Sequence, residues 1–447
     1  MKKLTLTLTT LLLCLAHSLA YADAGLSLQQ AINAAQQNDP WLHGNRLKQQ
    51  AVESRSEASS VMPDPRLSVG LMNLPVDGWD VNQEPMTQLS VGLSQMFPRG
   101  DSLAIKSSQL KIKSTQFPLL RQDRLAKIET VVSELWLDAY LAQATIGLIE
   151  KDWQLFEQMA EVAKASYANA VGKTRQQDVI RAQLEIVQLE DRLAAEQQKF
   201  ESATARLSEW LHRYDASQQT VIDFNEPSTG FTVSAELPEL ALTYPQLVSQ
   251  SAISTNALAE KLSQHPAVLA VDIEYQAAKK SIELAEQQYE PQWGVSASYG
   301  LRGDTPSGQS RADFFSLGVS VDLPLFTDRR QDNELSASIA ESEAVKTDKL
   351  LLIKRMLSEV EKESRQLMRL QQRQAIYQQQ LLTQIHEQAE ASLTAYTNDD
   401  GDFAEVVRAR IAELNAQIAA LQIDVQLLKT VVRLNYFFAG ADTTGVN

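Results

Sequence analysis

The sequence predicts an α+β membrane protein in which a tandem-duplicated unit supplies four transmembrane β-strands and long coiled-coil helices. Three observations lead to this prediction. The first residues direct export, one series of motifs occurs twice in the same order, and each copy combines two short alternating segments with very long helical ones. Segments of about 9–11 residues suit tilted strands that cross a membrane. Helices of the predicted length, at about 1.5 Å per residue, are too long to fold back onto one globular core.

Residues 1–22 are expected to be a secretory signal peptide. Lys2 and Lys3 precede the apolar run Leu4–Ala16, which is too short to cross a bilayer as a helix of about 20 residues. Two small-x-small patterns follow, ending at Ala22 and at Ala24, and signal peptidases cleave after such patterns. The mature chain would therefore begin at Asp23 or at Gly25. A membrane anchor is the less favoured alternative, because the run is short and a cleavage pattern follows it.

Composition excludes several classes of protein. The only cysteine, Cys14, lies in the leader, so we expect no disulfide and no thiolate metal ligand in the mature chain. Leu13 before it does not fit a lipidation site. A formal net charge of −15 argues against nucleic acid as a partner. No later segment is apolar enough for a transmembrane helix, so any membrane span is expected to be β-structure.

The duplication is indicated by motifs that keep a spacing of 226 or 227 residues. The matching pairs are Asp39-Pro40 and His265-Pro266, Pro65 and Pro291, Pro98 and Pro324, and Asp178–Ala182 and Glu405–Ala409. Prolines that keep their register over such a distance indicate a tandem repeat. We therefore divide the mature chain into a first repeat over 23–212, a linker or equatorial segment over 213–245, a second repeat over 246–440 and a tail over 441–447.

Four segments alternate between an apolar residue and a small polar one, and they are expected to be strands. They cover about 66–73, 88–96, 292–302 and 313–323. A half-buried sheet on a soluble protein would show the same alternation. In lipid, four strands leave open edges whose backbone groups have no partner. Three copies would give a shared 12-stranded barrel, so the sequence favours a homotrimer in outer-membrane lipid.

Helices are expected before and after each strand pair. The shorter ones cover 28–37, 41–61, 247–263 and 268–289. Residues 100–171 are expected to form one long helix with a kink near Pro118. The last helix carries apolar residues spaced alternately by three and four, which is typical of a coiled coil. They are Ile411, Leu414, Ile418, Leu421, Val425, Leu428 and Val432. These helices would form an α-barrel in the periplasm.

The tips of the two long hairpins are the candidate functional segments. The first tip holds Val171, Gly172, Lys173 and Thr174, and the second holds Tyr396, Asp399, Asp400, Gly401, Asp402, Glu405 and Arg408. Two interpretations stay open. The glycines and acids are typical of turns and helix caps. Under threefold symmetry, the acids would instead form carboxylate rings that favour cations, and Arg408 would pair with Glu405 or with an acid of a neighbouring chain.

No catalytic constellation is recognisable, and the chain is not expected to be an enzyme or to hold a cofactor. The histidines after the leader, His43, His212, His265 and His386, show no spacing of four residues that would suggest a zinc site. Four methionines lie around the first strand pair: Met62, Met72, Met86 and Met96. A copper path along them is an alternative to the usual role of methionine, which is to fill apolar space. We expect a passive conduit.

The doubled motifs resemble the TolC family of outer-membrane factors over nearly all of the mature chain. The resemblance is carried by Leu26–Ile32 with Asn38-Asp39-Pro40, by Gln264-His265-Pro266, by Leu323–Phe326 and by the Tyr, Gly and Arg-Ala pattern of both tips. Ser94–Gly100 is most similar to the heavy-metal branch, the outer-membrane components of cobalt–zinc–cadmium efflux systems.

This resemblance implies a homotrimer in the outer membrane of a Gram-negative bacterium, with a periplasmic adaptor protein and an inner-membrane RND-type pump as partners. It also implies adaptor docking at Val171–Thr174 and Gly401, and a gate in the second hairpin. Glu405 lies where the family often has its first gate acid, whereas Arg408 replaces a second one. Asp399 and Asp400 lengthen the turn.

Three alternatives stay open at this point. The cargo would be heavy-metal cations, drugs or a secreted polypeptide, since a duct of this fold need not distinguish them. A soluble periplasmic coiled-coil adaptor would lack the two strand pairs. An exported enzyme would need a clustered site, which the sequence does not suggest.

Overall fold

The structure is a computed structural model that describes residues 25–168, 175–212, 214–215, 220–221, 231–248, 253–398 and 401–440. The predicted leader, the tail over 441–447 and parts of both hairpin tips lie outside these residues. Two compact units are formed, and each draws on both halves of the chain. The first unit takes residues 1–43, 122–265 and 354–447, and the second takes 44–121 and 266–353. No described helix is both long and apolar enough to pass through a membrane.

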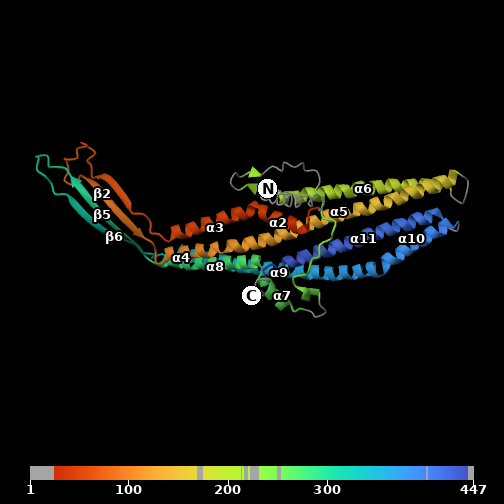
Figure 1. Cartoon of the computed structure of the whole chain (residues 1–447). Helices are drawn as coiled ribbons and strands as arrows, with labels where there is room; N and C mark the ends of the chain where they lie inside the picture. The colour runs from red at the N-terminus through yellow and green to blue at the C-terminus, as the bar shows by residue number, and fades with distance from the viewer. Residues whose placement is uncertain are drawn as a thin grey trace, which may run out of the picture. The chain divides into compact units, whose positions relative to one another are not determined.

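The described residues are mostly helical and include a four-stranded sheet (Figure 1). The helices of the first half are α2 (Leu28–Asn38), α3 (Pro40–Ser59), α4 (Ser102–Ser114), α5 (Gln116–Ala168) and α6 (Gln176–Leu211). Those of the second half are α7 (Thr255–Ser263), α8 (Pro266–Glu286), α9 (Gln331–Ile376), α10 (Leu382–Thr397) and α11 (Phe403–Tyr436). The strands are β1 (Arg66–Met72), β2 (Gln88–Phe97), β5 (Gln292–Arg302) and β6 (Phe314–Asp322). A short ribbon pairs β3 (Tyr214–Asp215) with β4 (Thr220–Val221).

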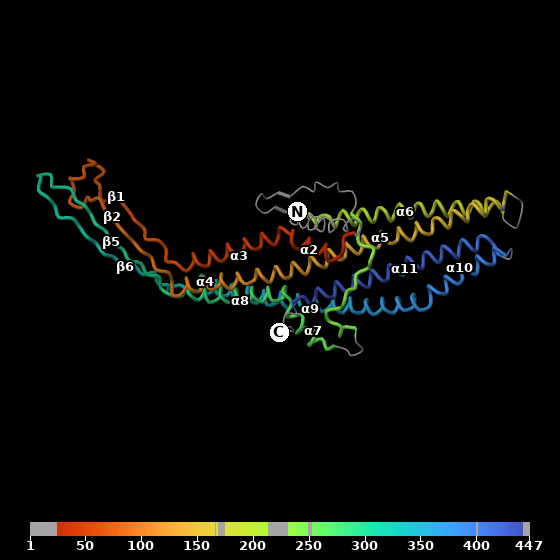
Figure 2. Tube along the Cα trace, in the orientation of Figure 1, coloured from red at the N-terminus to blue at the C-terminus, as the bar shows by residue number. Residues whose placement is uncertain are grey.

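The sheet of the second unit has the order β1-β2-β5-β6, and every neighbouring pair is antiparallel. The two hairpins therefore join through β2 and β5, as the tube in Figure 2 shows. This antiparallel sheet and the long helices confirm the predicted α+β class. Within the described residues, β1 and β6 each have a strand on one side only.

The two faces of the sheet differ in chemistry. Residues that oppose each other across strands share a face, and one such row is Leu67, Leu93, Ala297 and Leu317. The side chains of this apolar face are open, with Leu317 76% exposed. The opposite face carries rows of serine and glycine. One is Ser68, Gly92, Ser298 and Ser316.

Serine and glycine fit together closely on this small polar face. The Ser68 hydroxyl donates to the Gly92 carbonyl oxygen at 3.3 Å. A Cβ atom added to Gly92 would lie 2.8 Å from the same Ser68 oxygen. Because glycine has no Cβ atom, the neighbouring hydroxyl fits in the space beside it. This packing specifies the register between β1 and β2.

The base of the sheet is tied to the helices of the second unit by Arg99. Its guanidinium donates to the Glu290 carbonyl oxygen at 2.6 Å and forms an ion pair with Asp322 at the end of β6. Gly100 follows with a φ of +42°, which an L-residue rarely adopts, and the Asp101 amide donates to the Gln287 side chain. The motif that resembles the heavy-metal branch thus has a local structural role at the junction of strand and helix.

The interruption expected near Pro118 is found, and one other helix prediction is wrong in detail. The segment expected over 100–171 is divided at Thr115, because α4 ends at Ser114 and α5 begins at Gln116. Pro118 has no N–H to donate to the preceding turn, and it lies in the first turn of α5, a position that suits proline. The helix expected over 247–263 is shorter than predicted. Pro245–Val248 form a 3₁₀ turn, and α7 begins at Thr255, where Ser254 accepts a hydrogen bond from the Ala257 amide.

The core of the first unit is built around Trp136 of α5, which is fully buried. Its indole N–H donates to the Leu26 carbonyl oxygen at 2.7 Å, and its ring stacks on Tyr140 at 5.6 Å. The predicted seam of α11 is confirmed, because its side chains from Ile411 to Leu428 lie in the two apolar clusters of this unit and Val432 is also buried. The hairpins α5–α6 and α10–α11 therefore pack through the apolar side chains of the second cluster, and Figure 1 shows the course of the four helices.

Charged side chains also join three helices of the first unit. Arg433 of α11 forms an ion pair with Glu134 of α5, and its guanidinium lies 3.8 Å from a carboxylate oxygen of Glu363 on α9. The Glu363 side chain is only 4% exposed. One turn away on α11, Lys429 pairs with Asp138 of α5. A single guanidinium thus stands between two carboxylates.

The corresponding motifs of the two repeats hold their helices differently. Asp39 precedes α3 and accepts two hydrogen bonds from Arg124, at 2.7 and 3.3 Å. His265 precedes α8, and its Nε2 lies 3.0 Å from the Tyr436 carbonyl oxygen. In each repeat a proline follows as the first residue of the helix, where its fixed φ suits the helix start.

A change of pH should act on the first unit through His265, which is 1% exposed. Burial lowers the pKa of the His265 imidazole below its ordinary value, although nearby Asp123 opposes this shift. The unfolded chain therefore binds a proton at His265 more readily than the folded chain. The free energy of unfolding then decreases as the pH falls below about 6.5, and this contribution is fully present above that value.

We expect the thermal unfolding temperature to fall between about pH 7.5 and about pH 5, and to fall less in the His265→Gln variant. Circular dichroism in an uncharged detergent measures both. An equal fall in the two proteins would show that other groups account for the acid sensitivity.

Candidate functional site at the hairpin tips

The second hairpin tip is closed by a glycine and an aromatic pair. A Cβ atom added to Gly401 would lie 2.7 Å from the Tyr396 backbone nitrogen, so only glycine fits there without a shift. The Tyr396 ring meets the Phe403 ring edge to face at 5.6 Å, and Phe403 is 2% exposed. Tyr396, which the sequence placed in the gate, thus packs within its own chain.

Asp402 caps α11. Its backbone is extended, with φ −98° and ψ 131°, and its carboxylate accepts a hydrogen bond from the Ala404 amide at 3.0 Å. This contact satisfies one of the amides that have no partner inside the helix. The capping interpretation is therefore confirmed for Asp402. Asp399 and Asp400 lie outside the described residues.

Removal of this cap should weaken the tip measurably. Asp402→Ala is expected to destabilise the start of α11 by about 1 kcal/mol, whereas Asp402→Asn keeps a capping oxygen and should cost little. Amide hydrogen exchange at residues 403–408 measures the effect. If alanine and asparagine raise the exchange rates equally, the cap contributes through its charge rather than through this hydrogen bond.

Glu405 and Arg408 do not form the ion pair that was expected within one chain. The Arg408 Nε donates to the Ala404 carbonyl oxygen at 3.2 Å, which is a contact along its own helix. Glu405 is exposed, and among the described residues its carboxylate has no hydrogen bond or ion pair. Both charged groups therefore face outward. Of the two partners considered for Arg408, Glu405 is not paired with it in the single chain, because the guanidinium folds back onto the preceding turn. Pairing with an acid of a neighbouring chain stays a prediction.

The first tip is described only at its flanks. Val171, Gly172, Lys173 and Thr174 lie outside the described residues. Arg175 follows, and its amide donates to the Asp178 carboxylate at 2.8 Å. Asp178 is 5% exposed. The acid of the repeated Asp-Val-Ile-Arg-Ala motif thus fixes the start of α6.

The sequence reasoning missed an ion cluster that ties α10 to α11. Arg410 donates to Glu390 at 2.5 Å and to Glu413 at 2.8 Å. His386 Nδ1 lies 2.6 Å from the other oxygen of Glu413. Burial, together with the charge of Glu413, raises the pKa of Asp152 on α5. Glu390 and Arg410 lie 11 and 9 residues from Gly401, so counting outward from the turn could have placed them near each other across the hairpin.

The described residues contain no group of three or more His, Cys, Asp or Glu placed to hold a metal ion. Met62, Met72, Met86 and Met96 are all exposed, by 41, 48, 54 and 43% respectively. Met72 and Met96 lie on the small polar face of the sheet, near its opposite ends. The methionines are thus spread along the strand pair rather than gathered around one point.

Comparison with known proteins relates this architecture to efflux channels. Residues 257–438 match the family described as outer membrane efflux protein. No curated protein sequence matches the chain significantly.

Several solved structures have the same fold. CusC has a TM-score of 0.71 at 14% identity, and the match covers 92% of both chains. VceC of Vibrio cholerae has a TM-score of 0.71 at 14% identity, over 92% of this chain and 96% of its own. The open-state MtrE channel of Neisseria gonorrhoeae has 0.70 at 16% identity, over 93% and 89%. The chain therefore has the fold of TolC-type outer-membrane channels, and its second half carries the sequence pattern of the outer membrane efflux protein family.

Proposed function

We propose that the chain is the outer-membrane channel subunit of a tripartite efflux system, and that it serves as a passive exit duct. Three copies would share one 12-stranded barrel in the outer membrane of a Gram-negative bacterium. Their helices would project into the periplasm and meet an adaptor protein and an inner-membrane RND-type pump. The observation that carries this proposal is the sheet, which has an open apolar face and, within the described part of the chain, two edges without a paired strand.

The apolar face fits lipid better than a protein partner. It spans the four strands, and exposed Trp293, Phe315 and Val319 belong to it. Burial of each such side chain is worth about 1.5–3 kcal/mol. The opposite face, with its serines and glycines, suits a water-filled interior.

The two edges of the sheet fit a second and a third copy. Because β1, β2, β5 and β6 alternate in direction, β6 runs antiparallel to β1. The β6 strand of one copy therefore continues the alternation into the β1 strand of the next. Closure into a ring gives the backbone groups of every edge strand a hydrogen-bond partner, which is required because lipid offers none.

The gate is proposed at the second tip. Glu405 and Arg408 are exposed charged groups on the first turns of α11, and threefold symmetry would bring three sets of them together. Asp399 and Asp400 would extend the ring, while Asp402 serves as a cap. Adaptor docking is proposed at Val171–Thr174 and at Gly401.

Heavy-metal cations are the proposed cargo. The support is the resemblance of Ser94–Gly100 to the heavy-metal branch, together with carboxylate rings that favour cations. An efflux assay with cobalt, zinc and cadmium in cells that carry the chain with its neighbouring pump genes would test it. Protection against drugs but not against these metals would show that drugs, rather than metal cations, are the cargo.

Conductance in planar bilayers tests the channel and its gate. The purified mature chain should form small, mostly closed pores, and Arg408→Gln or the double variant Asp399→Asn with Asp400→Asn should raise the resting conductance. Glu361→Gln on α9 is the matched control, since it lies in an exposed pair with Arg365 far along the sequence from the tip. Unchanged conductance in all tip variants would remove these residues from the gate, and absence of any pore would remove the channel.

A further inference from the structure

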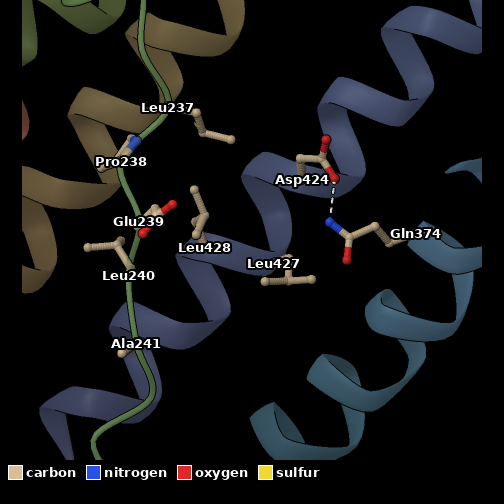
Figure 3. Close-up of a pocket in the computed structure, with 9 residues that line it drawn as sticks. All are labelled: Leu237, Pro238, Glu239, Leu240, Ala241, Gln374, Asp424, Leu427 and Leu428. Carbon is tan, nitrogen blue, oxygen red and sulfur yellow. Dashed lines mark hydrogen bonds between the residues drawn. The ribbon is translucent and has the colours of Figure 1, made fainter.

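A groove of about 560 Å³ lies in the first unit, between the segment 237–241 and helices α9 and α11. Figure 3 shows Leu237, Pro238, Glu239, Leu240 and Ala241 on the segment, Asp424, Leu427 and Leu428 on α11, and Gln374 on α9. Its volume and its mixture of apolar walls with a few polar groups are typical of small-molecule sites.

The walls of this groove are fixed before any ligand arrives. Before the segment in sequence, the Gln143 side chain forms two hydrogen bonds with the Val233 backbone. It donates to the carbonyl oxygen and accepts from the amide. On the other side, the Asn435 amide group donates to the Ala241 carbonyl oxygen at 2.9 Å, and its oxygen accepts from the Thr243 amide. The segment is therefore clamped at both ends by side chains of α5 and α11. A preformed groove lowers the entropy cost of binding.

Besides Gln374, the polar side chains that line the groove are two acids, Glu239 and Asp424. Asp424 accepts one hydrogen bond from the Gln374 side chain at 2.8 Å, which the dashed line in Figure 3 marks. Glu239 is exposed on the opposite wall. Among the described residues, neither carboxylate has a lysine, arginine or histidine within ion-pair distance. The charge of Asp424 also adds to burial in raising the pKa of Tyr140.

The apolar part of the groove comes from four leucines. Leu428 is 8% exposed, while Leu237, Leu240 and Leu427 are partly buried against the core around Trp136. A hydrocarbon chain that packs among these leucines is removed from water, and this stabilises the complex by about 25 cal/mol per Å² of apolar surface buried. Its polar head would meet two carboxylates.

We propose that this groove binds an amphipathic organic cation, with its hydrocarbon part among the leucines and its ammonium or guanidinium head between Glu239 and Asp424. An anion would face two like charges, and a neutral amphiphile would gain only the apolar contacts. This site does not depend on the proposed transport function.

Calorimetric titration of the mature protein with octylguanidinium, in an uncharged detergent, tests the site. The double variant Glu239→Gln with Asp424→Asn should bind the probe about tenfold more weakly than the original chain. Asparagine keeps the contact with Gln374, so the fold should persist. Octanol should bind both proteins equally and more weakly, and octyl sulfate should not bind.

Glu236→Gln is the matched control. Glu236 immediately precedes the segment 237–241 and does not line the groove, so its variant should bind octylguanidinium as the original chain does. Equal affinity of the double variant and the original chain would overturn the proposal, as would equal affinity of the original chain for octanol and for the cation.

A second measurement does not rely on the charge variants. The mature chain is expected to contain no cysteine, so Leu240→Cys would introduce a unique thiol into the groove. Octylguanidinium should slow its alkylation, whereas octyl sulfate should not. Alkylation at the same rate with and without the cation would contradict binding in this groove.

Discussion

Leu317→Arg should prevent the chain from accumulating in the outer membrane. Leu317 lies in the middle of β6 on the apolar face and is 76% exposed. If that face meets lipid, an arginine near the middle of the bilayer costs about 2–4 kcal/mol in each copy, and a trimer bears this cost three times. Fractionation of cell membranes, followed by detection of the chain, measures the loss.

The neighbouring residue provides the control. Ser316 precedes Leu317 on the same strand but lies on the small polar face. Ser316→Arg adds the same charge to the proposed water-filled interior, so this variant should still reach the outer membrane. If the two arginine variants accumulate equally, the apolar face does not meet lipid.

Arg433→Met should destabilise the first unit by about 3 kcal/mol. The change removes the cation that Glu134 and the nearly buried Glu363 share, and Glu363 then keeps only Lys362, at 3.2 Å, as an ion-pair partner. A buried charge that loses part of its compensation is costly. The value lies at the low end of the range for buried pairs, because the Arg433 side chain is 36% exposed. Urea unfolding followed by circular dichroism measures it.

Two further variants separate charge from packing. Arg365→Met removes an exposed pair with Glu361 on the same helix α9 and should change the free energy of unfolding by less than about 1 kcal/mol. Adding Glu363→Leu to Arg433→Met should recover part of the loss, since it removes the stranded carboxylate. An unchanged loss in this double variant would show that Arg433 acts through its contact with Glu134 alone.

The periodic parts of the fold were predictable from sequence. Alternation of apolar and small residues indicated the four strands, because successive side chains of a strand point to opposite faces of the sheet. The alternation did not indicate the register between the strands. The spacing of three and four from Ile411 to Val432 indicated the seam of α11, which the apolar clusters confirm. In both cases the pattern itself reports the environment of the side chains.

The predictions that were wrong or incomplete depended on local or long-range contacts without a period. Pro118 correctly indicated an interruption, but it did not show that the segment divides into two helices at Thr115. Arg408 suggested a pair with Glu405, but its own helix carbonyl accepts the hydrogen bond. Arg433 and Glu363 are 70 positions apart in sequence, and only the packing of α9 against α11 makes them neighbours. The groove at Glu239 likewise joins residues from three distant segments.

Disulfide trapping at the sheet edges tests the shared barrel most directly. One cysteine replaces Leu317 on β6, and a second replaces Leu67, Val69 or Leu71 on β1 in turn. Within one chain these strands are separated by β2 and β5, about 14 Å in all, which is too far for a disulfide. Oxidation in outer membranes should give covalent dimers and trimers and nothing larger for one of the three pairs. A water-soluble monomer, or a ladder of adducts that continues beyond the trimer, would contradict the closed channel.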